Sequence, residues 1–354
     1  MFEIDFLPVG DSNGDAICIR YGNDNQGYYV HVVDGGYTDT ADTIIKHIEE
    51  HYGAGYFINN MVLSHADNDH AMGLIGVMKR FEVKNLWMNR PWLYAAEILP
   101  HMHGNYTLPG LIDKIREMHP YLVELEDLAT QKGTVIHDAF QGASIGPFTV
   151  LAPSRERYID LLPDLDKTPT SYRADAGTTL GGLLKGLVEA AKEWFDETWD
   201  IETLSNNPDP TSASNETSVV QYGVIEGRRI LLTADVGPAG LNEAADYLAL
   251  MGVTLAPNFV QVPHHGSRRN VTPAVLDRLL GPIVGKGEKH GSAYCSVGKN
   301  KPEYPRGQVQ NAFERRGFPV YVTRGDAKCH HHQGKLRKGW VAAEPEPFAD
   351  KVEA

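Results

Sequence analysis

A dense group of side chains that bind metals lies between residues 65 and 70. His65, Asp67, Asp69 and His70 follow an apolar stretch, residues 61–64, that is typical of a buried strand. Imidazole nitrogens and carboxylate oxygens are ligands of zinc, manganese and iron, and ligands that alternate along an extended loop can face two adjacent ions. The run therefore predicts a metal site, although a polar loop that caps a helix could show the same residues.

Three other places add groups of the same kind. Asp34, Asp235 and the adjacent His264 and His265 each come directly after a predicted strand. Each has an ordinary alternative, with the aspartates in turns or helix caps and the histidines as a hydrogen-bonded pair on a loop. Because α/β folds gather their sites at the carboxyl ends of strands, the joint occurrence favours one shared site.

The elements that must position these groups alternate between strands and helices. A strand is expected over residues 83–89, after a helix that starts near His70. If this strand runs parallel to the one before His65, its outgoing loop emerges at the same rim, which makes Asn89 and Arg90 candidates for binding a substrate. Other strands are expected within 2–33 and over 146–154, 217–235, 258–262 and 319–323, and other helices over 40–53, 241–251 and 307–317.

Residues 155–214 interrupt this alternation, and they predict a helical insertion in a single domain of residues 1–342. Its longest helix is expected over 178–199, where apolar side chains recur at helical spacing and form one stripe. The stripe fits a helix docked on the body of the protein, a lid over the site or a dimer contact. Residues 343–354 are rich in Pro and Glu and predict a flexible tail.

The net charge limits the kinds of partner. The chain has a formal charge of -13 at pH 7, which repels polyanions at long range and disfavours a passive nucleic-acid-binding protein. A phosphate-bearing substrate would need local cations, and bound metal ions can supply them.

Cysteine usage and hydropathy indicate the cellular environment. Cys18, Cys295 and Cys329 are the only cysteines and form no CxxC pair, which fits a reducing compartment. The first residues lack the basic and apolar runs of a signal peptide, and no stretch approaches 18 uninterrupted apolar residues. We expect a cytoplasmic protein without a membrane segment. The run from Cys329 to His332 is interpreted as a solvated turn rather than a second metal site.

The order of the motifs resembles the metallo-β-lactamase superfamily. Four motifs carry the resemblance, namely DGG at 34–36, S-H-x-D-x-D-H at 64–70, T-x-D at 233–235 and P-H-H-G-S at 263–267. They are most similar to the branch that contains the hydrolase-like domain of ComEC-type competence proteins, and VGDSNGDAICIRYG, Asn215 with Ser218, and SVGKNKPEYP resemble further elements of that branch. The resemblance implies an α/β fold, an αββα sandwich with the metal site at one edge of its sheets.

The resemblance also implies a role for each residue of the site. His65 and Asp67 fall on the first metal, Asp69 and His70 on the second, and Asp235 on the carboxylate that bridges both ions. His265 matches the last histidine ligand, which leaves His264 near the substrate. The residues that match supporting positions around the ligands are Asp34, Asn215 and Ser218.

Two departures from the commoner superfamily pattern affect the metal. Asp67 stands where most members have a second histidine, and its harder oxygen shifts the preference from zinc towards manganese. The sequence also has no histidine between His137 and His264, so the middle histidine of the first metal site is missing, as in the competence branch. The expected cofactor is therefore two divalent ions, zinc or manganese, with the weaker binding at the first site.

The resemblance implies hydrolysis of a phosphodiester, in a nucleic acid or nucleotide, by a metal-activated hydroxide. Asp69 would orient the hydroxide and His264 would donate a proton. Three carboxylates against two divalent ions leave about one positive charge, so phosphoryl chemistry predicts that both sites are filled. Candidate substrate contacts are Asn89, Arg90, Lys299 and Asn300.

Two alternatives stay open at this point. The same site could open a lactone, a thioester or another small ester, because one fold hosts many chemistries. The chain could also be a metal-bearing interaction component of a multiprotein system, as a homodimer or with a partner protein, and the missing middle histidine supports this alternative.

Overall fold

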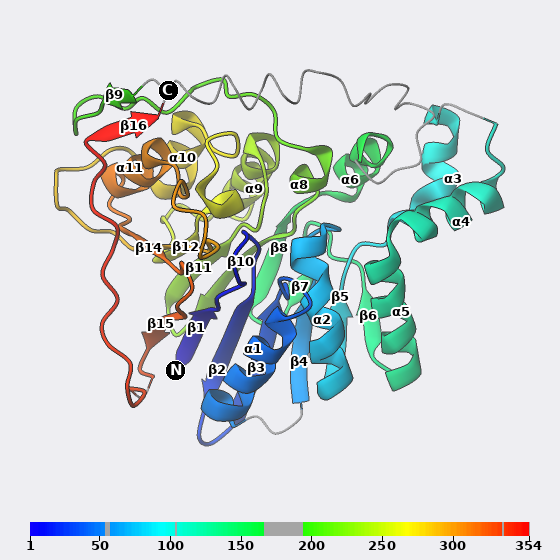
Figure 1. The fold of residues 1–354 in the computed structure, drawn as a ribbon. Helices are drawn as coiled ribbons and strands as arrows, with labels where there is room; N and C mark the ends of the chain where they lie inside the picture. Colours follow the sequence, from blue (N-terminus) through cyan, green and yellow to red (C-terminus); the bar gives the residue numbers. More distant parts are fainter. Residues whose placement is uncertain (54–56, 103–104, 166–193, 335, 354) are drawn as a thin grey trace.

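The protein is built around two seven-stranded mixed sheets that lie face to face (Figure 1). The computed structural model describes residues 1–354 except 54–56, 103–104, 166–193, 335 and 354. In spatial order, the first sheet contains β15 (Lys328–His332), β1 (Phe2–Phe6), β2 (Ile17–Asn23), β3 (Gly27–Val33), β4 (Phe57–Val62), β5 (Glu82–Trp87) and β6 (Val135–His137). The second contains β14 (Val320–Val322), β13 (Ser292–Cys295), β12 (Phe259–Gln261), β11 (Arg228–Leu232), β10 (Val220–Ile225), β8 (Phe148–Ala152) and β7 (Ser144–Ile145).

Helices cover the outer face of each sheet (Figure 1). On the first sheet lie α1 (Thr40–His47), η1 (Ile48–Tyr52), α2 (Asn68–Arg80), α4 (Leu108–Met118) and α5 (Pro120–Lys132). On the second lie α9 (Pro238–Leu250), α10 (Pro273–Leu280) and α11 (Gly307–Arg315). Short helical segments connect these parts: η2 (Pro91–Tyr94), α3 (Ala95–Ile98), η3 (Leu99–His101), α6 (Arg155–Leu161), η4 (Leu162–Asp164), α8 (Ala213–Glu216) and η5 (Pro263–Gly266).

Three apolar clusters hold the four layers together. Strand β1 shows how, since Phe2, Ile4 and Phe6 point into the cluster between the two sheets, whereas the alternate residues Glu3 and Asp5 point to the other face. The other two clusters join each sheet to its own helices. Burial on both faces of the sheets explains the nearly continuous apolar strands of the sequence, and the predicted αββα sandwich is confirmed.

Strand direction places the candidate ligands at one edge of the sheets. Strands β3, β4, β5 and β6 pair in parallel, as do β11, β12, β13 and β14. The expected parallel neighbours, β4 and β5, are therefore present. Since parallel strands end at the same edge, the loops after β3, β4, β11 and β12 meet there.

Three local predictions differ from the structure. Trp194–Asp196, placed in the long predicted helix, form strand β9, which pairs with β16 (Lys351–Glu353). The rest of the helical insertion lies partly in residues 166–193, outside the described residues. The predicted flexible tail makes fixed contacts, because Val352 is buried and Ala349 donates its backbone N–H to Asn311. The run Cys329 to His332 lies in β15, paired with β1, and is not a solvated turn.

Within the described part of the chain, no helix combines the length and apolar composition that crossing a bilayer requires.

Candidate metal centre

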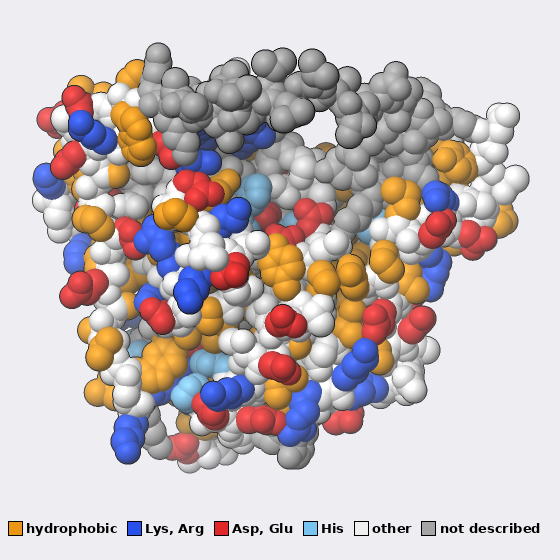
Figure 2. All heavy atoms as spheres, viewed as in Figure 1, with side chains coloured by type: hydrophobic (Ala, Val, Ile, Leu, Met, Phe, Trp, Pro, Cys, Tyr) orange, Lys and Arg blue, Asp and Glu red, His pale blue; other side chains and the backbone are white. Residues whose placement is uncertain are grey.

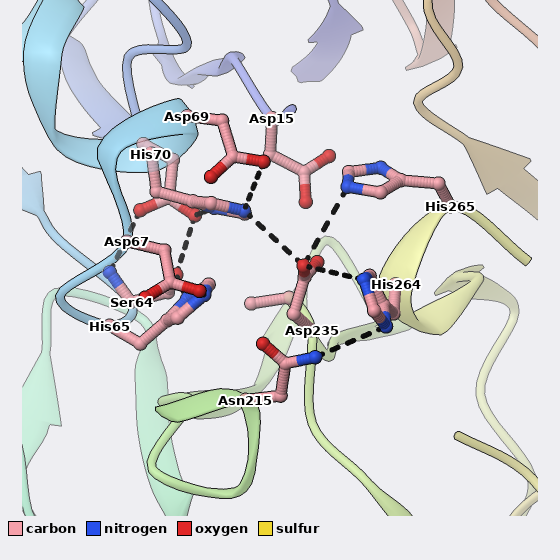
Figure 3. A network of polar contacts seen from close by, with 12 residues as sticks. Asp15, Ser64, His65, Asp67, Asp69, His70, Asn215, Asp235, His264 and His265 are labelled. Carbon is pink, nitrogen blue, oxygen red and sulfur yellow. Dashed lines mark hydrogen bonds and ion pairs between the residues drawn. The ribbon is translucent and has the colours of Figure 1, made fainter. Parts of the chain in front are cut away.

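Asp235 lies at the middle of a group of imidazoles (Figure 3). Its Oδ2 is 3.5 Å from Nε2 of His70, 3.5 Å from Nε2 of His264 and 3.6 Å from Nε2 of His265. These separations exceed normal hydrogen-bond lengths. They match the spacing of about 3.4 Å expected between ligands that surround one tetrahedral ion at about 2.1 Å.

The His and Asp side chains form overlapping groups in which all ligand atoms lie within 4.8 Å of one another. One contains His65, His70 and Asp235, a second Asp69, His70 and His265, and a third Asp235, His264 and His265. Because His70 and Asp235 belong to more than one group, the arrangement is consistent with a binuclear metal site.

Unsatisfied buried atoms test whether a metal fits here. Among the described residues, Nε2 of His65, His70 and His265 and Oδ1 of Asp235 are buried without a hydrogen-bond partner. Each such atom costs on the order of 1–3 kcal/mol if it stays unsatisfied. A cation that accepts these lone pairs removes the cost, and a mixed nitrogen and carboxylate set suits divalent transition metals.

Asp34 orients His70 from behind. Its Oδ2 lies 2.8 Å from Nδ1 of His70, and the same carboxylate accepts from the backbone N–H and the hydroxyl of Ser64 at 2.8 and 2.6 Å. The Nδ1–H that donates to Asp34 leaves Nε2 of His70 free to face the centre. Asp34 itself has φ +57°, a left-handed conformation that Asp tolerates better than most residues.

Replacing Asp34 with Asn is expected to weaken metal binding about 10- to 100-fold. Asn fits the same left-handed backbone, but its amide makes a weaker acceptor for the imidazole and lowers the basicity of Nε2 in His70. Calorimetric titration of metal-free protein with Mn²⁺ or Zn²⁺ would measure the effect. Asp246→Asn, at an exposed position of α9, is the matched control, and equal affinities of both variants would contradict the assignment.

The two histidines after β12 are held in a strained turn. His264 and His265 have φ values of 45° and 57°, which non-glycine residues rarely adopt. Nδ1 of His265 donates to the carbonyl of Ser296 at 2.9 Å, and Nδ1 of His264 lies 2.9 Å from Oδ1 of Asn270. Both contacts turn the Nε2 atoms towards Asp235, so the structure brings His264 as well as His265 to the candidate metal centre. His264 is 32% exposed and His265 only 2%.

The remaining predicted ligands form the open side of the centre. Oδ1 of Asp67 accepts from the Ser214 hydroxyl at 2.6 Å, while its Oδ2 lies 3.5 Å from Nε2 of His65. Oδ2 of Asp69 lies 4.0 Å from Nε2 of His70. In Figure 2, red and pale-blue side chains gather in a hollow beside the grey residues. The Asp67 and Asp69 side chains are 33% and 28% exposed, so the centre is reachable from solvent on the side of these two carboxylates.

The supporting residues predicted near α8 lie in two different places. Nδ2 of Asn215 is 3.2 Å from Nδ1 of His264, so Asn215 contacts the predicted proton donor. Ser218 is fully buried, and the next residue, Val219, donates its backbone N–H to the carbonyl of Ser64. Ser218 thus lies where the first sheet's ligand loop meets the second sheet.

The predicted substrate residues differ in their contacts, and Asn89 lines a small pocket together with the candidate ligand His65. The Asn89 side chain donates to the carbonyl of Ala139 and accepts from the backbone N–H of the same residue. Arg90 pairs with Glu126 at 3.0 Å. Lys299 and Asn300 are exposed. Their backbone N–H groups donate to the carbonyls of Gly10 and Asp11. Asn89 and Arg90 are half-buried and have structural partners, whereas Lys299 and Asn300 are exposed.

Asp15 is a buried carboxylate that the sequence interpretation missed. It projects towards the space between Asp69 and His265 (Figure 3), and with Asp34 and His70 it forms another compact group. Its Oδ2 accepts from Gln261 at 3.0 Å, but Oδ1 has no partner among the described residues. Burial raises the pKa of Asp15, against the opposing effect of the nearby histidines. Asp15 precedes β2, whereas the other candidate ligands follow strands, so the strand-end pattern did not indicate it.

The carboxylate and imidazole charges of the centre depend on each other. Burial alone raises the pKa of Asp235, but His264, His265 and His70 outweigh it and hold that pKa well below its usual range. Burial lowers the pKa of His70, yet Asp235 and Asp34 raise it well above its usual range. Metal binding at Nε2 of His70 therefore competes with protonation of the same nitrogen.

The chain is similar to a family model and to several solved structures. The model of the metallo-beta-lactamase superfamily matches residues 12–283, and no curated protein matches the sequence. Among solved structures, a metal-dependent hydrolase of the beta-lactamase superfamily shares 10% identity and a TM-score of 0.41, over 93% of this chain and 99% of the other. A variant metallo-beta-lactamase from Cronobacter sakazakii shares 14% identity and a TM-score of 0.30, over 70% and 68%.

The family match spans more than half of the chain and covers every candidate ligand described above. The donor groups at the strand ends also fit a divalent metal centre. The chain therefore belongs to the metallo-beta-lactamase superfamily, as a metal-dependent hydrolase.

Proposed function

We propose that the protein hydrolyses phosphodiesters and uses two divalent ions. The composition of the centre carries this proposal, because Asp67, Asp69 and Asp235 give three negative charges against four positive ones from two ions. About one positive charge remains for an anionic substrate.

Two side chains around the centre have different roles in the proposed reaction. When bound, divalent ions lower the pKa of a coordinated water to about 7 and withdraw charge from the phosphate. Asp69, on the open side, orients the attacking water by accepting its hydrogen bond. His264 is the most exposed histidine of the cluster, and it donates a proton to the leaving oxygen while Asn270 holds its other nitrogen.

The order of the motifs supports a relationship to the ComEC-type competence branch. The resemblance of this chain to that branch is the reason for proposing phosphodiesterase or nuclease activity. The sequence has no histidine between His137 and His264, so the middle histidine is missing, and Asp67 stands where most members have a second histidine. This shift from nitrogen to oxygen ligands favours manganese over zinc. Cytoplasmic location and a homodimer or protein partner stay predictions.

A direct comparison of two reporters tests the proposed chemistry. Metal-free protein reconstituted with Mn²⁺ is expected to hydrolyse bis(p-nitrophenyl) phosphate at least tenfold faster, in kcat/KM, than p-nitrophenyl acetate, with lower rates in Zn²⁺. Asp69→Ala gives the background rate in both assays.

Faster turnover of the neutral ester would overturn the phosphodiesterase proposal and favour a small-ester hydrolase. Absence of turnover in both assays, together with a stable complex in a pull-down, would favour the metal-bearing interaction component.

A further inference from the structure

A pocket lined by residues of both sheets lies outside the candidate metal centre. It has a volume of about 360 Å³, and small-ligand sites typically have about 300–1,000 Å³. Its walls come from strands β2, β3, β4 and β5 of the first sheet and from the turn between β7 and β8 of the second. None of the residues that line it is a candidate metal ligand, so an occupant of this pocket would be separate from the metal ions.

The Asn60 side chain presents an N–H group to this pocket. Its Oδ1 accepts from Nε1 of Trp87 at 3.1 Å and from Nδ2 of Asn85 at 3.4 Å. These two donors fix the orientation of the Asn60 amide, because its oxygen must face them. Asn60 is only 6% exposed, and its Nδ2 has no hydrogen-bond partner among the described residues. A ligand with an acceptor atom would satisfy this donor.

The Tyr21 hydroxyl lies close to the same amide. A Cβ at Gly146 would lie 2.6 Å from this hydroxyl and 3.2 Å from Nδ2 of Asn60, so both groups face the bare backbone of Gly146. Gly146 has φ +60°, a left-handed conformation that favours glycine. Burial raises the pKa of Tyr21 to about 12, so its hydroxyl keeps its proton at neutral pH. One ligand can therefore accept hydrogen bonds from Tyr21 and Asn60 together.

Lys84 gives the pocket a positive charge. It is the only charged side chain among the residues that line the pocket, which include no carboxylate. Lys84 is exposed, and it forms no ion pair with another described residue. The chain as a whole carries a charge of -13, which disfavours anions at long range. A lysine without a local carboxylate, beside two further donors, therefore favours an anionic group of a ligand at this place.

Aromatic rings supply the apolar part of the pocket. The rings of Tyr21 and Tyr29 stack with centroids 5.4 Å apart and an interplanar angle of 14°. Trp87 stacks on His137 at 4.3 Å and 21°. These contacts hold the rings in place, and Tyr29 is still 46% exposed. Rings fixed in this way pack well against a planar aromatic ligand.

We propose that this pocket binds a small aromatic carboxylate. Its ring packs against Tyr29 and Trp87, and its carboxylate accepts from Lys84, the Asn60 amide and the Tyr21 hydroxyl. Such a ligand contacts both sheets, so its binding stabilises their association. This inference is independent of the proposed hydrolysis, because the pocket shares no residue with the candidate metal centre.

The test uses the full-length protein reconstituted with Zn²⁺, which is diamagnetic, and 4-(trifluoromethyl)benzoate as the probe. Fluorine NMR of the probe gives Kd. Lys84→Gln is expected to raise Kd about tenfold, because it removes a charge-assisted hydrogen bond, and Tyr21→Phe about fivefold. Two matched controls should leave Kd unchanged: Lys46→Gln, at a side chain of α1 that is 74% exposed, and Tyr28→Phe, whose hydroxyl bonds Asp24.

Two further probes test the chemical class of the ligand. 4-(Trifluoromethyl)benzamide has the same ring without the charge, and trifluoroacetate has the charge without the ring, so each should bind the wild type at least about tenfold more weakly. The benzoate probe should also raise the Tm of the wild type, and raise that of Lys84→Gln less at the same concentration. Equal Kd values for wild type and Lys84→Gln, or for the benzoate and benzamide probes, would refute the assignment.

A carboxylate can also bind a metal ion, so the titration is repeated with metal-free protein. An unchanged Kd for the benzoate probe supports the pocket. Binding that disappears with the metal ion and is insensitive to Lys84→Gln would place the probe at the metal centre and contradict the proposal.

Discussion

Asp235→Ala is expected to reduce hydrolysis at least about 10³-fold and to lower the metal content of the purified protein. Three imidazole nitrogens surround one oxygen of this carboxylate at 3.5 to 3.6 Å, so its loss affects both positions of a binuclear centre. Loss of residues that merely support ligands already costs about 10- to 100-fold, and a shared ligand should cost more. Steady-state kinetics and elemental analysis of the same preparations measure both effects.

Two controls separate this loss from unfolding. Asp246→Ala removes an exposed carboxylate from α9 and should retain the activity and metal content of the wild type. The far-UV circular dichroism of Asp235→Ala should match that of the wild type, because the residue lies in a loop after β11. Retention of two ions per chain in a folded Asp235→Ala protein would contradict the shared-ligand assignment.

Arg315→Ala is expected to lower the free energy of unfolding by about 3–5 kcal/mol. Arg315 is fully buried at the end of α11 and pairs with buried Glu197 at 2.5 Å. It also donates to the carbonyls of Trp199 and Ile201 at 3.0 and 2.6 Å. Removal of the guanidinium leaves the Glu197 charge buried without its partner, and thermal unfolding should show Tm lower by roughly 5–10 °C.

A variant of an exposed arginine provides the control for the expected loss of stability in Arg315→Ala. Arg278→Ala breaks an exposed pair with Asp246 and should change the free energy of unfolding by less than about 0.5 kcal/mol. Adding Glu197→Gln to Arg315→Ala should recover part of the loss, since it removes the uncompensated charge. Equal Tm values for the two arginine variants would show that the buried pair does not anchor residues 197–201.

Local patterns predicted most of the fold because each strand and helix carried its own signal. The hairpin of β10 and β11 followed from alternating apolar residues around Glu226 and Gly227, which both adopt the left-handed conformations of such a turn. Pairings between distant segments gave no comparable signal. Strand β9 depends on β16 about 155 residues later, and β15 depends on β1, so neither could be read from its own residues.

For the candidate metal centre too, residues with a local sequence signal were predicted, and residues placed there by distant contacts were not. The ligands that follow strands were predictable because parallel strands end at one edge. Asp15 was missed because it reaches the centre from the start of a strand. The neighbouring Gly14 allows this close approach, since a Cβ there would lie 2.7 Å from the carbonyl of Asp69. Asn89 and Arg90 were expected at the rim, but the sequence could not reveal that Ala139 and Glu126 already bind them.

The pairing of β1 with β15 also has a consequence for synthesis on the ribosome. One edge of β1 stays without its partner until His332 has been made. At about 5–20 residues per second this interval lasts roughly 15 seconds to a minute. An unpaired strand edge invites association with other chains, and charged side chains oppose it. Glu3 and Asp5, which Arg20 and Arg337 neutralise in the finished protein, would keep the nascent strand from aggregating during that wait.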